Sequence, residues 1–153
     1  MLRITLAWLH LLALALGLGS VFTRSAALNA RPLTLRDARR AFKADSYWGA
    51  AAVLWIATGV WRLVAHTEKA MTYYGHNDIF MAKMGGLILI LLLEIWPAIT
   101  LVRWRRAAAR SGDGWAPDQS VARRVAAIGH LQALIVIVMV GLAVAMARGY
   151  GAR

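Results

Sequence analysis

Four long apolar runs, separated by clusters of arginine, constrain the fold of this chain more than any other feature of its sequence. The runs cover about residues 2–22, 46–65, 78–102 and 120–147. Each run has about 20 residues or more, the length a helix needs to cross a hydrocarbon core ~30 Å thick. Helices are the expected form because lipid cannot satisfy open backbone groups, and no alternating barrel pattern occurs. The sequence therefore predicts an all-α, four-helix transmembrane bundle, one integral membrane domain over residues 1–153.

Composition agrees with a membrane protein whose partner is the lipid bilayer. Hydrophobic residues make up 60% of the chain and charged residues only 16%, whereas soluble domains carry about 25% charged residues. The net charge of +11 does not indicate a nucleic-acid partner, because no basic patch is interleaved with aromatic residues that could stack on bases. The chain has no cysteine, which excludes disulfides, thiolate metal ligands and a cysteine nucleophile.

The distribution of positive charge predicts the orientation. Twelve of the 18 lysines and arginines lie in two segments, 23–45 and 103–124. Loops rich in lysine and arginine stay in the cytoplasm, so both termini are expected outside (N-out and C-out) in a bacterial inner membrane. Within the first loop, TLRDARRAFKAD at 34–45 is a basic amphipathic segment. We expect this segment to lie on the cytoplasmic surface with its arginines toward lipid phosphates.

The first apolar run has an alternative interpretation. Arg3, the apolar stretch and the small residues near 26–30 also resemble a cleaved signal peptide. The run is nearly a full span, however, and a dense basic segment follows it directly. Both features favour a retained transmembrane helix.

Four polar residues inside the runs are the candidate functional groups, because polar side chains are costly in lipid. They are His10, Lys83, Glu94 and His130. His10 shares a helical face with small residues that allow close helix approach. It is therefore expected to face the bundle, either as a hydrogen-bonded histidine or as a haem or metal ligand.

Lys83 and Glu94 are expected to belong to different layers. They are eleven residues apart on one helical face, roughly 16 Å along the axis, and cannot pair with each other. Lys83 lies with His10 in the outer half, where its stem could reach the interface. Glu94 is too deep to do so and must be protonated, paired or facing a wet cavity. His130 lies at a similar depth, so a buried polar pair of Glu94 and His130 is predicted in the inner half.

The sequence offers no further catalytic or metal site. His66 and His76 in the predicted external hairpin could bind a metal, but loop histidines are usually solvated, and solvation is the favoured interpretation. No phosphate-binding loop, activated serine or pair of carboxylates occurs. Whether the protein is an enzyme stays open at this point.

The stretch YYGHNDIFMAKMGGLILILLLEIWPAITLVRWRR at 73–106 resembles a bacterial family of small predicted membrane proteins, domain-of-unknown-function family 2214. The family pattern has a YY…N…F…K segment, an apolar run, a Pro-Thr-like step and a closing RWRR. Here the step is Pro97-Ala98, and Glu94 replaces an expected small residue. The resemblance spans nearly the whole chain and implies a fold but no activity.

The chain is also distantly similar to the four-helix bacterial membrane protoporphyrinogen oxidases, which are haem-linked. The similarity rests on LHLLALALGLGSVFTR at 9–24 and on the lysine near the start of the third run. It implies that His10 is an axial ligand, that Lys83 binds a propionate or acts as a second ligand, and that Arg24 closes the helix. The third run lacks the later histidine expected in those enzymes and has Glu94-Ile95-Trp96 instead.

Two functions therefore compete. The first is a haem- or porphyrin-associated redox protein that uses His10 and Lys83, with haem b or a porphyrin as the cofactor. The alternative is a non-enzymatic membrane protein, either a small transport element or a structural subunit of a membrane complex. In both cases the glycine-rich helix faces predict a homo-oligomer or a subunit of a larger assembly.

Overall fold

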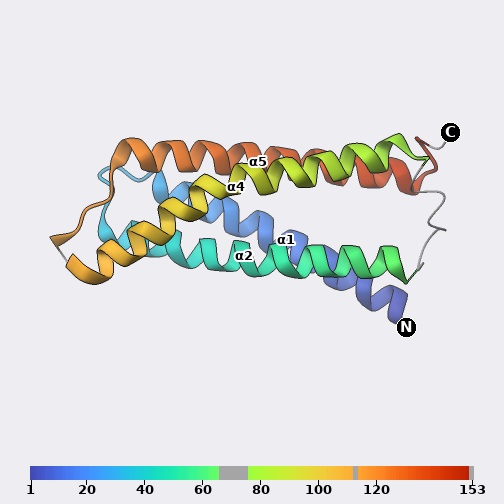
Figure 1. Cartoon of the computed structure of the whole chain (residues 1–153), viewed down its shortest axis with the longest axis horizontal. Coiled ribbons are helices and arrows are strands. Elements are labelled where there is room, and N and C mark those ends of the chain that lie inside the picture. The colour runs from blue at the N-terminus through green and yellow to red at the C-terminus, as the bar shows by residue number, and fades with distance from the viewer. Residues whose placement is uncertain (66–75, 112–113, 152–153) are drawn as a thin grey trace.

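The computed structural model describes residues 1–65, 76–111 and 114–151, and these residues form four long helices (Figure 1). The helices are α1 (Leu2–Leu28), α2 (Leu35–Val64), α4 (Asp78–Ser111) and α5 (Gln119–Ala147). Each of them is long and apolar enough to cross a membrane. The predicted all-α fold with four transmembrane helices is confirmed, and its orientation stays a prediction.

The basic amphipathic segment is part of a transmembrane helix rather than a separate surface helix. α2 begins at Leu35, where Thr34 and Asp37 form a capping box: Thr34 Oγ1 accepts from the Asp37 amide at 3.3 Å, and Asp37 Oδ2 accepts from the Thr34 amide at 3.1 Å. Ala38 and Ala41 are fully buried. These small residues let the segment pack into the bundle, so the helix continues straight into the second span.

Two other features shape the ends and the course of the helices. Asp118 caps α5, and hydrogen bonds from Ser120 and from the Val121 amide lower the pKa of its carboxyl. α4 passes through the buried Pro97, which has no amide to donate to the preceding turn. Figure 1 shows α4 beside α5 over its first half and turning toward the start of α2 over its second half.

The helices pack as two hairpins. α1 packs most extensively against α2 and also against α5, α4 packs against α5, and α2 and α4 make few contacts with each other. The side nearer the α1–α2 and α4–α5 connections is called the loop half here, and the side nearer the chain termini the terminal half (Figure 1). One apolar cluster, around Leu28, Leu101 and Val125, lies in the loop half. A second cluster lies around Trp48, Ile90 and Met139.

In the loop half, α1 and α5 approach each other closely at Gly129. A Cβ atom at this position would clash with Ser25 Oγ and would lie 3.7 Å from Ser25 Cβ. Any residue larger than glycine therefore requires the Ser25 hydroxyl to move.

At the end of the terminal half, the C-terminal residues are bonded to the start of α4. Asn77 Oδ1 accepts from the Phe80 amide at 3.0 Å, and Asn77 Nδ2 donates to the Tyr150 carbonyl at 3.3 Å. The Asp78 amide donates to the Gly151 carbonyl at 3.1 Å. α4 and α5 are thus tied together at this end by hydrogen bonds as well as by packing.

Candidate functional site

A buried network of charged and amide side chains crosses the loop half, and its centre is Arg24 of α1. The Arg24 side chain is 0% exposed. Its Nη1 donates to Asp45 Oδ1 at 2.9 Å and to Glu94 Oε1 at 2.6 Å. Its Nη2 donates to Glu94 Oε2 at 3.1 Å and to Gln132 Oε1 at 3.0 Å. The bidentate pair with Glu94 is the stronger type of arginine–carboxylate contact.

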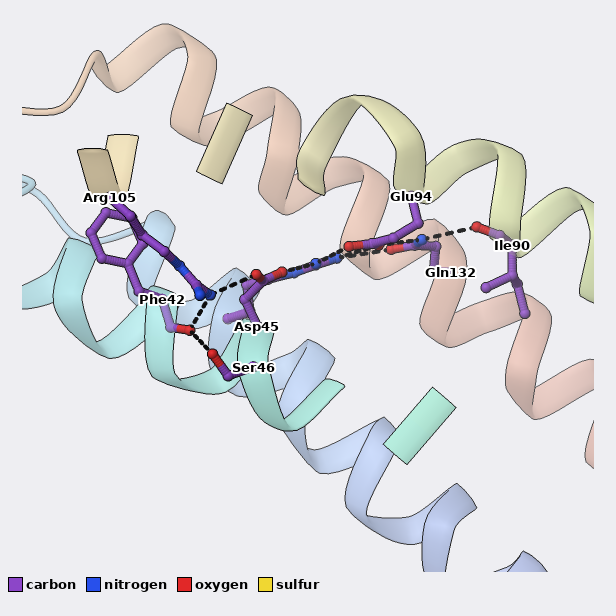
Figure 2. Close-up of polar contacts among 8 residues, drawn as sticks. Phe42, Asp45, Ser46, Ile90, Glu94, Arg105 and Gln132 are labelled. Atoms are coloured by element: carbon purple, nitrogen blue, oxygen red, sulfur yellow. Dashed lines mark hydrogen bonds and ion pairs between the residues drawn. The ribbon is translucent and has the colours of Figure 1, made fainter. Parts of the chain in front are cut away.

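The network extends from Arg24 in both directions (Figure 2). Asp45 Oδ2 accepts from Arg105 Nη2 at 2.7 Å, and the same nitrogen donates to the Phe42 carbonyl. Gln132 Nε2 donates to Glu94 Oε2 at 2.8 Å and to the Ile90 carbonyl at 3.3 Å. All four helices therefore contribute at least one side chain to a single set of hydrogen bonds.

The charges within this network balance. Two guanidinium groups, of Arg24 and Arg105, face two carboxylates, of Asp45 and Glu94. A charge in a membrane span is tolerated when it pairs with an opposite charge inside the bundle. Of the guanidinium nitrogens, Arg24 Nε and Arg105 Nε are buried without a hydrogen-bond partner among the described residues. The arrangement is that of an internal tie between helices, since both carboxylates already have cationic partners.

The structure does not bring Glu94 and His130 together. Glu94 bonds to Arg24 and Gln132, while His130 is exposed and its ring lies 6.3 Å from that of Phe22. The reason is the rotation of α5, since two residues correspond to about 200° around a helix. Gln132 lies on the buried face of α5, so His130 points away from it.

In the terminal half, His10 is held by two neighbours from α2. Its Nδ1 lies 3.0 Å from Thr58 Oγ1, and its ring stacks on Trp55 with centroids 5.5 Å apart and planes inclined by 27°. The Thr58 hydroxyl donates to the Leu54 carbonyl at 2.7 Å. His10 Nδ1 and Thr58 Oγ1 therefore share a hydrogen bond whose direction depends on the imidazole tautomer, and the ring is also hydrogen-bonded to the Trp55 backbone. A histidine oriented by a hydrogen bond at one ring nitrogen is the usual form of a metal-ligating histidine.

Lys83 of α4 lies near His10 and differs from every charge in the network. It is half-buried, and it forms no hydrogen bond or ion pair with any residue that the structure describes. The charges of Lys83 and Arg62 both act on His10. The terminal half thus combines an oriented imidazole with an ammonium group that has no anionic partner among residues 1–65, 76–111 and 114–151.

The space enclosed near these groups is small. An apolar cavity of about 30 Å³ lies among the four helices, lined by residues that include Trp48, Trp55 and Leu87. The Trp55 Nε1 atom is buried without a hydrogen-bond partner in the described part of the chain. Within that part, no group of three or more His, Cys, Asp or Glu residues could hold a metal ion. His66 of the predicted external hairpin lies outside the residues that the structure describes.

Four side chains of the network, those of Arg24, Asp45, Arg105 and Gln132, are not predicted from the sequence as part of a site. The resemblance assigns Arg24 only to the end of the first helix, and His130 rather than Gln132 is the candidate on the fourth run. One signal for Arg24 is present, because Gly17, Val21 and Arg24 follow one another at helical spacing and all three are buried. This is the continuation of the bundle-facing stripe that begins at His10.

Comparison with known proteins agrees with the predicted family. A family model described as "Predicted membrane protein (DUF2214)" matches residues 2–151. No curated protein and no solved structure matches the chain. The similarity to the membrane protoporphyrinogen oxidases therefore stays a prediction. The match over nearly the whole length shows that the chain belongs to domain-of-unknown-function family 2214, a family of predicted membrane proteins.

Proposed function

We propose that this multi-pass membrane protein binds a carboxylate-bearing ligand in its terminal half, at His10 and Lys83. The observation that carries the proposal is the unpaired state of Lys83 in the same half of the bundle as an oriented histidine: no described residue hydrogen-bonds to the Lys83 ammonium, and Thr58 holds His10 at Nδ1. An ammonium group within an apolar span is costly unless it meets an anion. The loop-half network, whose charges are all paired, serves as the scaffold that presents these two groups.

Haem b or a porphyrin is the candidate ligand that would use both groups. His10 Nε2 would bind the iron of a haem, and Lys83 would pair with a propionate. The bound group would supply redox chemistry. The protein's own residues would bind and orient it: Thr58 fixes the imidazole and Trp55 stacks on it.

An imidazole and an ammonium group are suitable partners for the iron and a propionate of a tetrapyrrole, but the cavity inside the bundle is too small to enclose one. The cavity of about 30 Å³ is far below the ~300 Å³ that is the lower range of small-molecule pockets. His10 and Lys83 are both partly exposed. A tetrapyrrole would therefore lie against the open side of the bundle, with one edge toward lipid or toward a second protein.

The second candidate is a non-enzymatic role as a small transport element or a structural subunit of a membrane complex. It is favoured by the same small cavity and by the balanced network, which gives the bundle a fixed interior. In that role the anion that meets Lys83 would come from a neighbouring subunit or from a second copy of the chain. For both candidates we infer an N-out, C-out arrangement in a bacterial inner membrane, supported by the twelve cationic residues of segments 23–45 and 103–124.

The absorption spectrum of protein purified from haem-replete cells separates the two candidates. If the first holds, the preparation has a Soret band, His10→Ala abolishes it, and Lys83→Met weakens it. His130→Ala is the matched control, because His130 is an exposed histidine on the other hairpin, and it should leave the spectrum unchanged. A colourless preparation that takes up neither haem nor a porphyrin would overturn the tetrapyrrole.

The second candidate has its own readout. If a neighbouring subunit supplies the anion, Lys83→Met should shift the mass of the detergent-solubilised assembly toward the monomer. An unchanged mass together with a colourless preparation would exclude both roles for Lys83.

A further inference from the structure

An open groove lies between α1 and α2 in the loop half, away from His10. It has a volume of about 580 Å³. Small or hydroxyl-bearing residues of α1 form one wall, and residues of the first half of α2 form the other. Gly19, Ser20 and Thr23 belong to the first wall, and Arg40, Lys43 and Tyr47 to the second.

The groove is hollow because α1 presents little side-chain volume there. A Cβ atom added at Gly19 would meet no atom within 4 Å. Toward the bundle centre the floor continues to Ala15 and Leu16, so the deeper part is apolar. A methylene chain fits such a surface without exposing backbone groups to lipid.

The hydroxyl groups of the wall are satisfied within α1. Ser20 Oγ donates to the Leu16 carbonyl at 2.6 Å, and Thr23 Oγ1 donates to the Gly19 carbonyl at 2.8 Å. Their hydrogens are therefore used locally. Recognition of a charged group in this groove has to come from the two cations of α2.

Arg40 and Lys43 are three residues apart on one face of α2 and both are exposed. Side chains at this spacing lie next to each other on a helix. Neither forms a salt bridge with a described residue. Tyr47 follows one turn later, at the depth where aromatic side chains gather at the membrane interface.

We propose that this groove binds an anionic phospholipid, with the phosphate between Arg40 and Lys43 and one acyl chain along Gly19, Leu16 and Ala15. The two cations lie just before the second apolar span, which is the depth of lipid phosphates. A free phosphate would leave the apolar floor uncovered. A second copy docked by the same face would bring like charges together at Arg40 and Lys43.

Native mass spectrometry of the full chain, released from nanodiscs, tests the proposal. Phosphatidylglycerol should be retained in preference to phosphatidylcholine with the same acyl chains. Arg40→Gln with Lys43→Gln should reduce this preference by roughly 10- to 30-fold, because each cation near the surface contributes ~1 kcal/mol toward anionic lipid. The control, Arg36→Gln with Arg110→Gln, removes the same charge from exposed positions outside the groove and should preserve the preference.

A second pair of variants tests the groove rather than the charge. Gly19→Leu places a side chain in the groove from a position where the added Cβ meets no atom within 4 Å, and it should abolish lipid retention while the protein stays folded. Gly141→Leu is the control, since a Cβ there also meets no atom within 4 Å, and it should retain the lipid. The proposal is overturned if Gly19→Leu keeps the preference or changes the oligomeric mass instead. It is also overturned if inorganic phosphate displaces the lipid, or if the Arg36 and Arg110 variant loses the preference equally.

Discussion

The two halves of the bundle treat buried charge in opposite ways. In the loop half, each carboxylate of the network has a cationic partner, and the central Arg24 bonds to three other helices. In the terminal half, Lys83 has no anionic partner among the described residues, and His10 is oriented by Thr58 at Nδ1. Because lipid offers no replacement for a missing partner, paired charges serve the fold and unpaired ones indicate a ligand. Four sets of variants test this difference between the two halves.

Arg24→Leu should have the largest effect. It leaves Glu94 without a cation and Asp45 with only Arg105, and losing one partner of a buried ion pair costs on the order of 3–5 kcal/mol. We expect little monodisperse protein in detergent by size-exclusion chromatography. Arg36→Leu, at an exposed position of α2, is the control and should behave as the native chain. If the two variants are equally stable, the network is not what holds the loop half together.

Glu94→Leu and Glu94→Gln should differ in how much they lower the stability of the protein. Leucine removes both the charge and the acceptor, and should cost on the order of 3–5 kcal/mol. Glutamine keeps an oxygen that accepts from Arg24, and Asp45 remains as the opposite charge. A smaller loss in the free energy of unfolding, about 1–3 kcal/mol, is therefore expected. Thermal unfolding midpoints in detergent would show the difference. Equal losses from both changes would mean that hydrogen bonding at this position contributes nothing.

Gly129→Ala tests close packing in the loop half and should cost about 1–3 kcal/mol, because its Cβ would clash with Ser25 Oγ. Adding Ser25→Ala to the same chain removes the clashing atom and should restore the unfolding midpoint. The terminal-half counterpart is Gly59→Ala, whose Cβ would lie 3.3 Å from His10 Cε1, and a smaller loss is expected. A double variant no more stable than Gly129→Ala would contradict the contact.

Lys83→Met should have the smallest effect on stability. It removes an ammonium group that has no partner in the described chain and keeps a side chain of similar length. The unfolding midpoint should therefore stay the same or rise, and the free energy of unfolding should change by less than ~1 kcal/mol. A loss as large as that of Arg24→Leu would show that Lys83 has a structural partner, and the contrast between the two halves would fail.

The fold follows from the sequence because length and hydropathy alone identify the four spans. The ends are less accurate: α1 continues to Leu28 and α2 begins at Leu35. Segment 34–45 is predicted as a surface helix because its arginines and lysine lie among apolar residues. The capping box and the buried alanines show that its other face belongs to the bundle.

The loop-half network could not be predicted because it depends on how the helices rotate. Arg24 stands just past the first apolar run, where arginines usually belong to a loop. Gln132 and His130 are two residues apart, and sequence reasoning selected the wrong face of α5. His130 is the candidate partner because histidine is ionisable and binds metals, whereas Gln132 is neutral. Gln132 is nevertheless the residue that hydrogen-bonds to Glu94.

The division of the network between the hairpins bears on how the chain enters the bilayer. Arg24 and Asp45 belong to α1 and α2, while Glu94 and Gln132 belong to α4 and α5. Each hairpin thus carries its own polar pair, and helices insert before they associate. In the first hairpin the Arg24 cation already has the Asp45 carboxylate as its partner, whereas in the second the Glu94 carboxyl has only the Gln132 amide. Docking of the hairpins keeps both local bonds and adds the Arg24–Glu94 and Arg105–Asp45 ion pairs, so Glu94 and Arg105 gain their opposite charges only in the assembled bundle.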